Sequence, residues 1–134
     1  LYVEGAAAFD EFTRTDRDEL LLRPEQANWF RRGRFVPAVE YLQAQRIRYL
    51  LVQAMHQMMR DIDVYVAPTS GGDNLMVTNL SGHPCVVLPH GFKEDGTPVS
   101  LSFIGTLFGE ARLLAVARLY QEATDFHLKH PDLN

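Results

Sequence analysis

The sequence predicts an α/β fold, because a long amphipathic helix is followed at once by a short β-branched strand, a hairpin and a second helix. Pro37 suits the first helical position, and the apolar residues after it recur at spacings of three, four and seven as far as about Arg60. We therefore expect a helix of about six turns. The residues that share its apolar face are Leu42, Ile47, Leu50, Leu51, Ala54 and Met58.

Three strands are predicted after this helix. Residues 64–67 form a compact β-branched and aromatic run before a proline, which is typical of a buried strand. Residues 85–88 form a second strand, 95–96 supply a turn, and 99–103 alternate apolar residues with serine. This spacing predicts an antiparallel hairpin with one face covered.

Two further segments complete this region. Residues 69–82 are rich in Gly, Ser, Thr and Asn, so we expect a loop with a short apolar insert at 75–77. A helix is predicted after Gly109 and is expected to end at Pro131. Its shared apolar face consists of Leu113, Val116, Ala117, Tyr120 and Ala123.

The first quarter of the chain has weaker patterns. Apolar spacing predicts a short helix over 3–14, and residues 16–18 break that pattern. The pair Arg23-Pro24 then stops any regular element, because the residue before proline disfavours the helical region. The chain starts at Leu1 within a helix-like segment, and we expect it to be part of a larger polypeptide.

The composition narrows the class of protein. A chain of 134 residues with 46% hydrophobic and 22% charged residues is expected to fold around one core. The net charge is -4, and Arg31, Arg32 and Arg34 are too few to form a nucleic-acid-binding face. Cys85 is the only cysteine, and no apolar stretch approaches the roughly 20 residues that span a bilayer. We expect a soluble, cytoplasmic protein with no internal disulfide.

Several short motifs occur in an order and at spacings that resemble the C-terminal region of the amidase-signature family. The matching segments are Asp63-Val64-Tyr65-Val66-Ala67-Pro68-Thr69, Asn79-Leu80-Ser81-Gly82-His83-Pro84, Val87-Leu88-Pro89-His90-Gly91-Phe92, Gly96-Thr97-Pro98-Val99 and Phe103-Ile104-Gly105. The helix segment 41–48 is also similar. The resemblance covers residues 37–131 and divides the chain into a helical lead-in, 1–36, and an amidase-like α/β region, 37–134.

This resemblance implies a C-terminal fragment of an α/β/α mixed-sheet enzyme that cleaves carboxamides by acyl transfer to a serine. The family's catalytic groups are that serine, a second serine in a cis peptide and a lysine. Two alternatives stay open: a fragment of the A subunit of a glutamyl-tRNA(Gln) amidotransferase, and a non-catalytic module that associates with itself. Ser102 and His90 stand where family members often carry glutamine and cysteine, which puts the glutamine-transfer subtype in doubt.

No catalytic residue is predicted in this chain. The serines include no adjacent pair, and the two lysines, Lys93 and Lys129, occupy polar settings where an amine keeps its proton. The serines are Ser70, Ser81, Ser100 and Ser102. The chain alone is therefore predicted to be inactive, and its first partner is expected to be the missing N-terminal catalytic portion.

The resemblance implies that residues 69–82 form one wall of the pocket for a small carboxamide substrate. The substrate-binding candidates are Asp73, Thr78, Asn79, Ser81 and Gly82. Asp73 lies one residue away from the position where glutamine-using members hold a carboxylate for the substrate ammonium. The alternative is that Asp73 serves a turn, that Asn79 and Ser81 tie down the backbone, and that Gly82 relieves a constraint before proline.

Other site chemistries are not favoured. His83, Cys85, His90, His127 and His130 do not form a ligand pattern, so no metal and no cofactor are predicted. A triad of Ser81, His83 and Asp73 is rejected because residues so close in one loop rarely reach the required geometry. The residues Met55, Met58 and Met59, with His56, are predicted to fill the core.

Exposed strand edges and apolar faces are expected on any piece of a larger sheet. Such surfaces drive self-association, so we expect the isolated chain to form a homodimer or a larger assembly.

Overall fold

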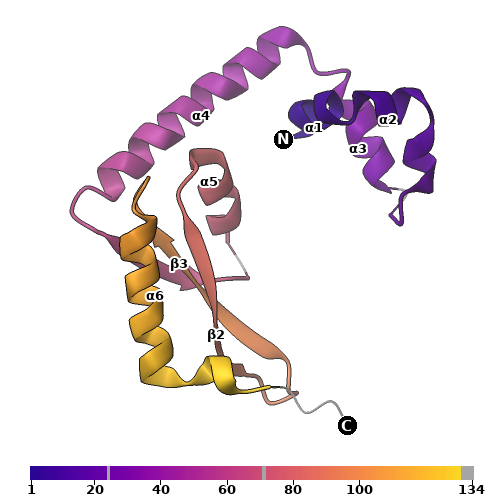
Figure 1. The fold of residues 1–134 in the computed structure, drawn as a ribbon. Coiled ribbons are helices and arrows are strands. Elements are labelled where there is room, and N and C mark those ends of the chain that lie inside the picture. The colour runs from indigo at the N-terminus through magenta and orange to yellow at the C-terminus, as the bar shows by residue number, and fades with distance from the viewer. Residues whose placement is uncertain (24, 71, 131–134) are drawn as a thin grey trace. The chain divides into compact units, whose positions relative to one another are not determined.

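The computed structural model describes residues 1–23, 25–70 and 72–130 (Figure 1). The chain forms two compact units, Leu1–Ile47 and Arg48–Asn134. The second unit combines helices with a sheet, which confirms the predicted α/β class. The predicted functional division after residue 36 rests on the resemblance alone and stays a prediction.

The sheet of the described residues has three antiparallel strands in the order β1-β3-β2. Its strands are β1 (Val64–Pro68), β2 (Cys85–Phe92) and β3 (Pro98–Gly105). The predicted hairpin is confirmed, because β2 and β3 are adjacent and joined at the predicted turn. Gly96 has φ of 80°, and the backbone N–H of Thr97 donates to Asp95 Oδ1 at 2.9 Å.

The strand β2 continues to Phe92, four residues beyond the predicted end at Leu88. Pairing with β3 resumes at Phe92 after an irregularity that begins at Pro89. Gly91 has φ of 103° within this interval, a conformation that glycine adopts without steric cost. The strand therefore continues through a bulge beyond Leu88, where the sequence pattern predicted that it would end.

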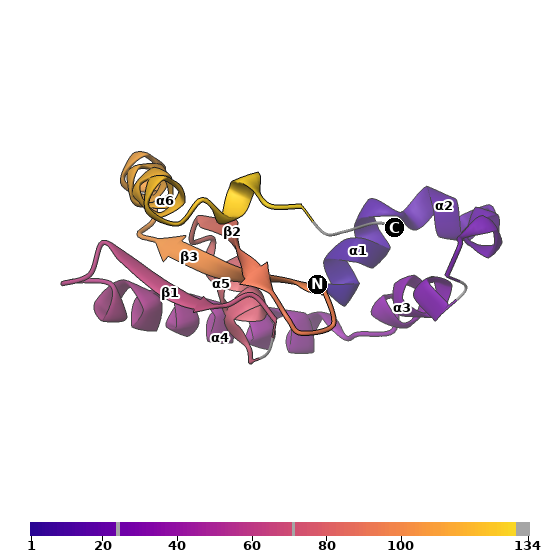
Figure 2. The ribbon, with the colours of Figure 1, turned by 90° about the horizontal axis from the view of Figure 1, so that it is seen from below.

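One face of the sheet is covered by α6 (Glu110–Thr124), as Figure 2 shows. The buried cluster consists of Leu88, Phe103, Leu113 and Ala117. Gly105 lets the helix approach, since a Cβ there would lie 3.2 Å from Leu113 Cβ. The predicted apolar face of this helix is confirmed at Leu113, Val116, Ala117 and Tyr120.

The predicted end of this helix was wrong. The helix α6 ends at Thr124, where Asp125 adopts a left-handed φ of 53°, and a short 3-10 helix, η2 (Phe126–Leu128), follows. The backbone N–H of Asp125 donates to the carbonyl of Gln121, which closes the helix without proline. Pro131 lies outside the described residues.

The segment predicted to be a loop contains a helix, α5 (Asn74–Ser81). It lies on the face of the sheet opposite α6 (Figure 2). Thr78 Oγ1 donates to the carbonyl of Asn74 at 2.9 Å, so a residue of low helix propensity has its hydroxyl satisfied within the helix. Gly82 ends α5 with φ of 81° and donates its N–H to the carbonyl of Thr78. Tertiary packing has thus overridden local propensity.

Because α5 covers the second face, the prediction that one face of the hairpin is covered was incomplete. Ser102 and Ile104, which point away from α6, are both buried. Ile104 is the most buried apolar residue of β3, at 1% exposure. The alternation of apolar residues and serine in β3 therefore separates two covered faces rather than a covered face and a solvated face.

The long helix α4 (Ala38–Met58) has 21 residues, which confirms its predicted extent. Its predicted apolar face is largely exposed: Leu42, Ile47 and Leu50 are 60%, 67% and 64% exposed. Met55 and Met59 are buried as predicted, whereas Met58 is 47% exposed. Arg48 Nε donates to the carbonyl of Leu80 at 2.7 Å, which ties this helix to α5 within the second unit.

The first unit contains α1 (Tyr2–Ala8), α2 (Asp10–Arg14), η1 (Arg17–Leu20), α3 (Glu25–Gly33) and the start of α4. The single helix predicted over 3–14 is broken at Phe9, which leaves the helical region at ψ of 26°. The predicted break near Asp16 is confirmed by its left-handed φ of 54°. The sequence reading missed α3, and Pro24 lies outside the described residues.

A buried carboxylate connects η1 to α3. Asp18 is fully buried and accepts hydrogen bonds from Arg31 Nε at 2.8 Å and Arg31 Nη2 at 2.9 Å. The bidentate guanidinium lowers the pKa of the Asp18 carboxyl. This pairing satisfies a charge that would otherwise be costly to bury.

Gly33 allows α1 and α3 to touch backbone to backbone. A Cβ at Gly33 would lie 2.3 Å from the carbonyl oxygen of Tyr2 and 2.9 Å from Ala6 Cβ. A Cβ at Gly5 would instead meet the ring of Phe30 at 3.5 Å, an ordinary contact. The two glycines therefore form a matched pair for testing this helix contact.

We predict that Gly33→Ala lowers the free energy of unfolding by about 1–3 kcal/mol, because the helices must separate. Gly5→Ala should be neutral or stabilising by up to about 1 kcal/mol, since alanine favours the helix. Urea denaturation followed by the fluorescence of Trp29, the only tryptophan, measures both variants. Equal stability of the two variants would contradict the close contact.

Candidate functional site

A pocket of about 80 Å³ lies between α5 and the sheet. Its floor comes from the strand residues whose side chains face α5, and its wall comes from α5 itself. The lining residues are Thr69, Asn74, Leu75, Thr78, Cys85, Val87, Ser102 and Ile104. This is the candidate site because residues of the predicted substrate wall meet the sheet here.

The polar groups of the pocket are neutral hydroxyl and amide groups. Thr69 Oγ1 and Ser102 Oγ are 3.1 Å apart and share a hydrogen bond. The hydroxyl of Tyr65 donates to Asn74 Oδ1 at 3.3 Å, which orients this amide. Burial raises the pKa of Tyr65, so its phenol stays protonated. None of the described residues that line the pocket carries a formal charge.

The structure separates the five predicted substrate-binding residues. Thr78 lines the pocket, and Asp73 immediately precedes α5 at the N-cap position. Asn79 is exposed and donates from Nδ2 to the carbonyl of Leu75 at 2.7 Å. Ser81 is buried at the end of α5, and Gly82 closes the helix. Thr78 is therefore the one of the five that lines this pocket.

Ser81 and His83 lie within hydrogen-bond reach, which the sequence reading did not anticipate. Ser81 Oγ and His83 Nδ1 are 2.8 Å apart, a distance that suits a nucleophile and its base. Both side chains are only 6% exposed, and neither lines the pocket. In the described part of the chain, no hydrogen bond links His83 to a carboxylate such as Asp73. The pair therefore lacks the substrate access and the orienting acid of a working triad.

Electrostatic effects favour the neutral form of the His83 ring. Burial lowers the pKa of His83 because the imidazolium loses hydration, and the nearby His56 lowers it further. The neutral ring can share a proton with Ser81 in either tautomer. The contact fixes the chain between α5 and β2 at the point where the strand begins.

Over residues 1–23, 25–70 and 72–130, no three histidine, cysteine or acidic side chains converge as metal ligands. None of the helices within these ranges is both long enough and apolar enough to cross a membrane.

Several pocket residues were missed as site candidates. Cys85 and Val87 alternate with the half-buried Val86 and the buried Leu88 on β2, and Ser102 and Ile104 lie on either side of Phe103 on β3. The period of two predicts that each pair shares a face with the other, since Cys85 is paired with Ile104 and Val87 with Ser102. The alternation that places these residues on one face of the sheet can be read from the sequence of the hairpin. The helix α5, which turns this face into a pocket, was not predicted.

No protein-family profile matches the chain. The A subunit of the glutamyl-tRNA(Gln) amidotransferase of Thiobacillus denitrificans is 33% identical over 111 residues, covering 69% of this chain and 23% of the relative. The corresponding protein of Chromobacterium violaceum is 38% identical over 112 residues with the same coverage. The chain thus spans about a quarter of the length of these curated relatives.

Two solved structures share the fold. They belong to a protein complex described as vestigial and as revealing the evolutionary origins of an s-triazine catabolic enzyme, and one contains an inhibitor. Each has a TM-score of 0.78 at 22% identity, over 91% of this chain and 32% of the other.

The sequence match and the shared fold confirm the predicted resemblance of this chain to amidase-signature proteins. More particularly, the chain matches a segment of the A subunits of glutamyl-tRNA(Gln) amidotransferases.

We predict that the His83 ring titrates below its ordinary pKa of 6.5. A depressed folded-state pKa means that stability is fully present above pH 6.5 and declines as the pH falls through the folded pKa. His56→Gln should raise the midpoint, because it removes a like charge. An NMR titration of the ring protons measures both, and a wild-type midpoint above 6.5 would contradict the burial argument.

Proposed function

We propose that this chain forms part of the substrate-binding wall of an amidase-signature enzyme that cleaves small carboxamides by acyl transfer to a serine. The observation that carries the proposal is the 33% to 38% identity with the A subunits of amidotransferases, whose reaction class is carbon–nitrogen bond chemistry. The pocket under α5 suits this role, since its neutral hydroxyl groups can donate hydrogen bonds to and accept them from a carboxamide, which is also neutral.

The proposed catalytic groups, a serine, a cis-peptide serine and a lysine, lie on polypeptide outside these 134 residues. Two features support this part of the proposal. The curated relatives are about four times longer than the matched segment, and the sequence contains neither adjacent serines nor a lysine near the pocket. The proposed cytoplasmic location follows the same analogy with the amidotransferases.

Two reactions are considered for the parent enzyme: hydrolysis of its substrate, and transfer of ammonia from it. The identity with the amidotransferases favours transfer from glutamine. Glutamine carries an ammonium and a carboxylate, and a pocket that recognises it needs charged partners for both. Asp73 lies beside the pocket at the start of α5 and could serve the ammonium, whereas the lining itself is neutral. The neutral lining favours an amidase for a less polar carboxamide.

The proposal predicts that the isolated chain does not hydrolyse a simple test amide, whereas the longer parent polypeptide does. Within that polypeptide, Leu75→Trp should raise KM by about tenfold or more, because the indole would fill the mouth of the pocket. Steady-state kinetics with a series of aliphatic and aromatic amides measures the effect.

Met76→Trp is the matched control, because Met76 is another exposed apolar residue of α5 that does not line the pocket. Its KM should change by no more than about twofold. Equal effects of the two substitutions on KM would contradict the proposal that this pocket binds the substrate. Hydrolysis by the isolated chain would place the catalytic groups within it. That result would overturn the proposal that these groups lie on polypeptide outside the 134 residues.

Self-association is the second candidate, and the exposed apolar face of α4 favours it. Leu42, Ile47 and Leu50 would be costly to leave in water, and β1 and β2 are edge strands of the described sheet. A second copy of the chain can cover these surfaces when the rest of a larger fold is absent.

We predict a homodimer or larger species in sedimentation velocity experiments on the isolated chain. Leu50→Glu should shift the distribution toward monomer, because it places a charge on the apolar face. Asn28→Asp adds a negative charge at an exposed polar position of α3, outside α4, and should leave the distribution unchanged. A wild-type chain that stays monomeric at high concentration would contradict the prediction.

A further inference from the structure

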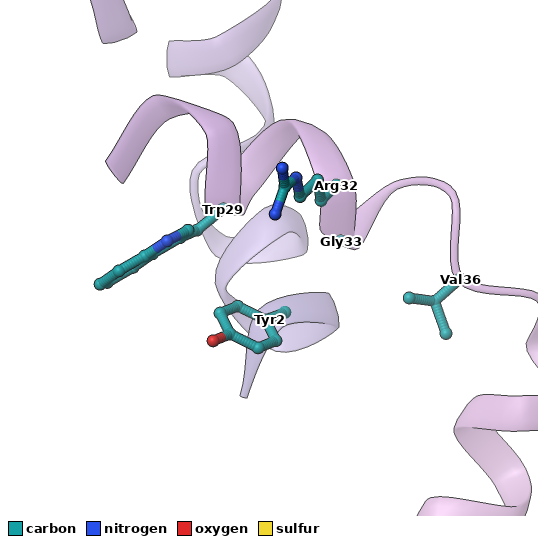
Figure 3. Close-up of a pocket in the computed structure, with 5 residues that line it drawn as sticks. All are labelled: Tyr2, Trp29, Arg32, Gly33 and Val36. Atoms are coloured by element: carbon teal, nitrogen blue, oxygen red, sulfur yellow. The ribbon is translucent and has the colours of Figure 1, made fainter. Parts of the chain in front are cut away.

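A second pocket, of about 180 Å³, is built entirely from the unit Leu1–Ile47. It is lined by Tyr2 from α1, by Trp29, Arg32 and Gly33 from α3, and by Val36 from the segment after α3 (Figure 3). None of these residues takes part in the proposed amidase site. The pocket therefore requires its own explanation.

Two aromatic rings form the apolar part of the pocket. The rings of Tyr2 and Trp29 meet edge to face, with centroids 6.1 Å apart and an interplanar angle of 69°. Both rings stay partly exposed, Tyr2 at 61% and Trp29 at 47%, so their faces are available to a ligand. A cavity of about 150 Å³ can hold benzene, so the space here suits one aromatic ring with a small substituent.

Arg32 supplies the polar part. Its neighbours in sequence are already paired, Arg31 with Asp18 and Arg34 with Asp10. In the described part of the chain, no hydrogen bond or ion pair occupies the guanidinium of Arg32. Figure 3 shows this group extending from α3 toward the space between Trp29 and Tyr2. A guanidinium with free donors beside aromatic rings matches the planar, bidentate geometry of a carboxylate.

The backbone at the base of the pocket is closely packed. Gly33 lies so close to the backbone of Tyr2 that even a methyl group would not fit. The contact holds the backbone of α1 against α3 at the residues that carry the two aromatic side chains. A preformed pocket loses little conformational entropy on binding.

We propose that the juxtaposition of Tyr2, Trp29 and the unpaired Arg32 binds a small aromatic carboxylate. The ring packs against Tyr2 and Trp29, with Val36 on a further side, and the carboxylate accepts hydrogen bonds from Arg32. A neutral aromatic amide makes the same ring contacts but lacks the charge that Arg32 requires. The ligand class therefore differs from the carboxamides of the proposed amidase site.

Benzoate is the probe, and Trp29 reports binding because it is the only tryptophan in the chain. We expect a saturable change of Trp29 fluorescence when benzoate is added to the full chain. Benzamide, the uncharged isostere, should bind about two- to fivefold more weakly, since an ion pair at an exposed site contributes on that scale. This comparison uses the wild-type protein and is independent of any folding defect.

Arg32→Gln should weaken benzoate binding by about two- to fivefold and leave benzamide binding unchanged. The matched control is Arg60→Gln, because Arg60 is exposed and does not line this pocket. It should bind benzoate as the wild type does. Equal affinity for benzoate and benzamide, an unaltered Arg32→Gln variant, or no saturable fluorescence change would each overturn the proposal.

Discussion

The central position of β3 is the constraint on which the second unit depends. This strand pairs with β1 on one side and β2 on the other, and residues on both of its faces are buried. Phe103 points into the cluster under α6, and Ile104 points toward α5. Because successive side chains alternate, a shift of one residue in register would exchange the two environments and move buried serine against α6. The hairpin geometry therefore decides which residues can line a site.

The face of the sheet that α5 covers contains the candidate pocket. Burial of hydroxyl groups is tolerated there because Thr69 pairs with Ser102 and Thr78 bonds within its own helix. The result is a small pocket with hydrogen-bonding capacity and no charge on its described lining. Such a surface can contribute shape and polarity to a carboxamide site, while bond cleavage needs groups that this face does not contain. Ser81 and His83 lie 2.8 Å apart, but both side chains are buried and neither lines this pocket.

The first unit is organised by different contacts. The paired Asp18 and Arg31 hold η1 to α3, and Gly33 brings α3 against α1. These two contacts use one arginine internally and leave the next, Arg32, directed into an aromatic pocket. Ion pairing and close helix packing thus explain why adjacent arginines in one short basic run have different environments. The run is too dispersed in its contacts to serve as one charged surface.

The sequence by itself determined the strands, the hairpin turn and the long helix, because period-two alternation, Asp95-Gly96 and the apolar spacing after Pro37 are local signals. It also determined the family resemblance. It did not determine α5, whose Thr, Asn and Ser residues favour loops until the sheet supplies a surface to pack on. Likewise, only the tertiary structure brought Thr78 to Ser102 and Arg32 to Tyr2, since residues distant in sequence become neighbours through packing that no local pattern encodes.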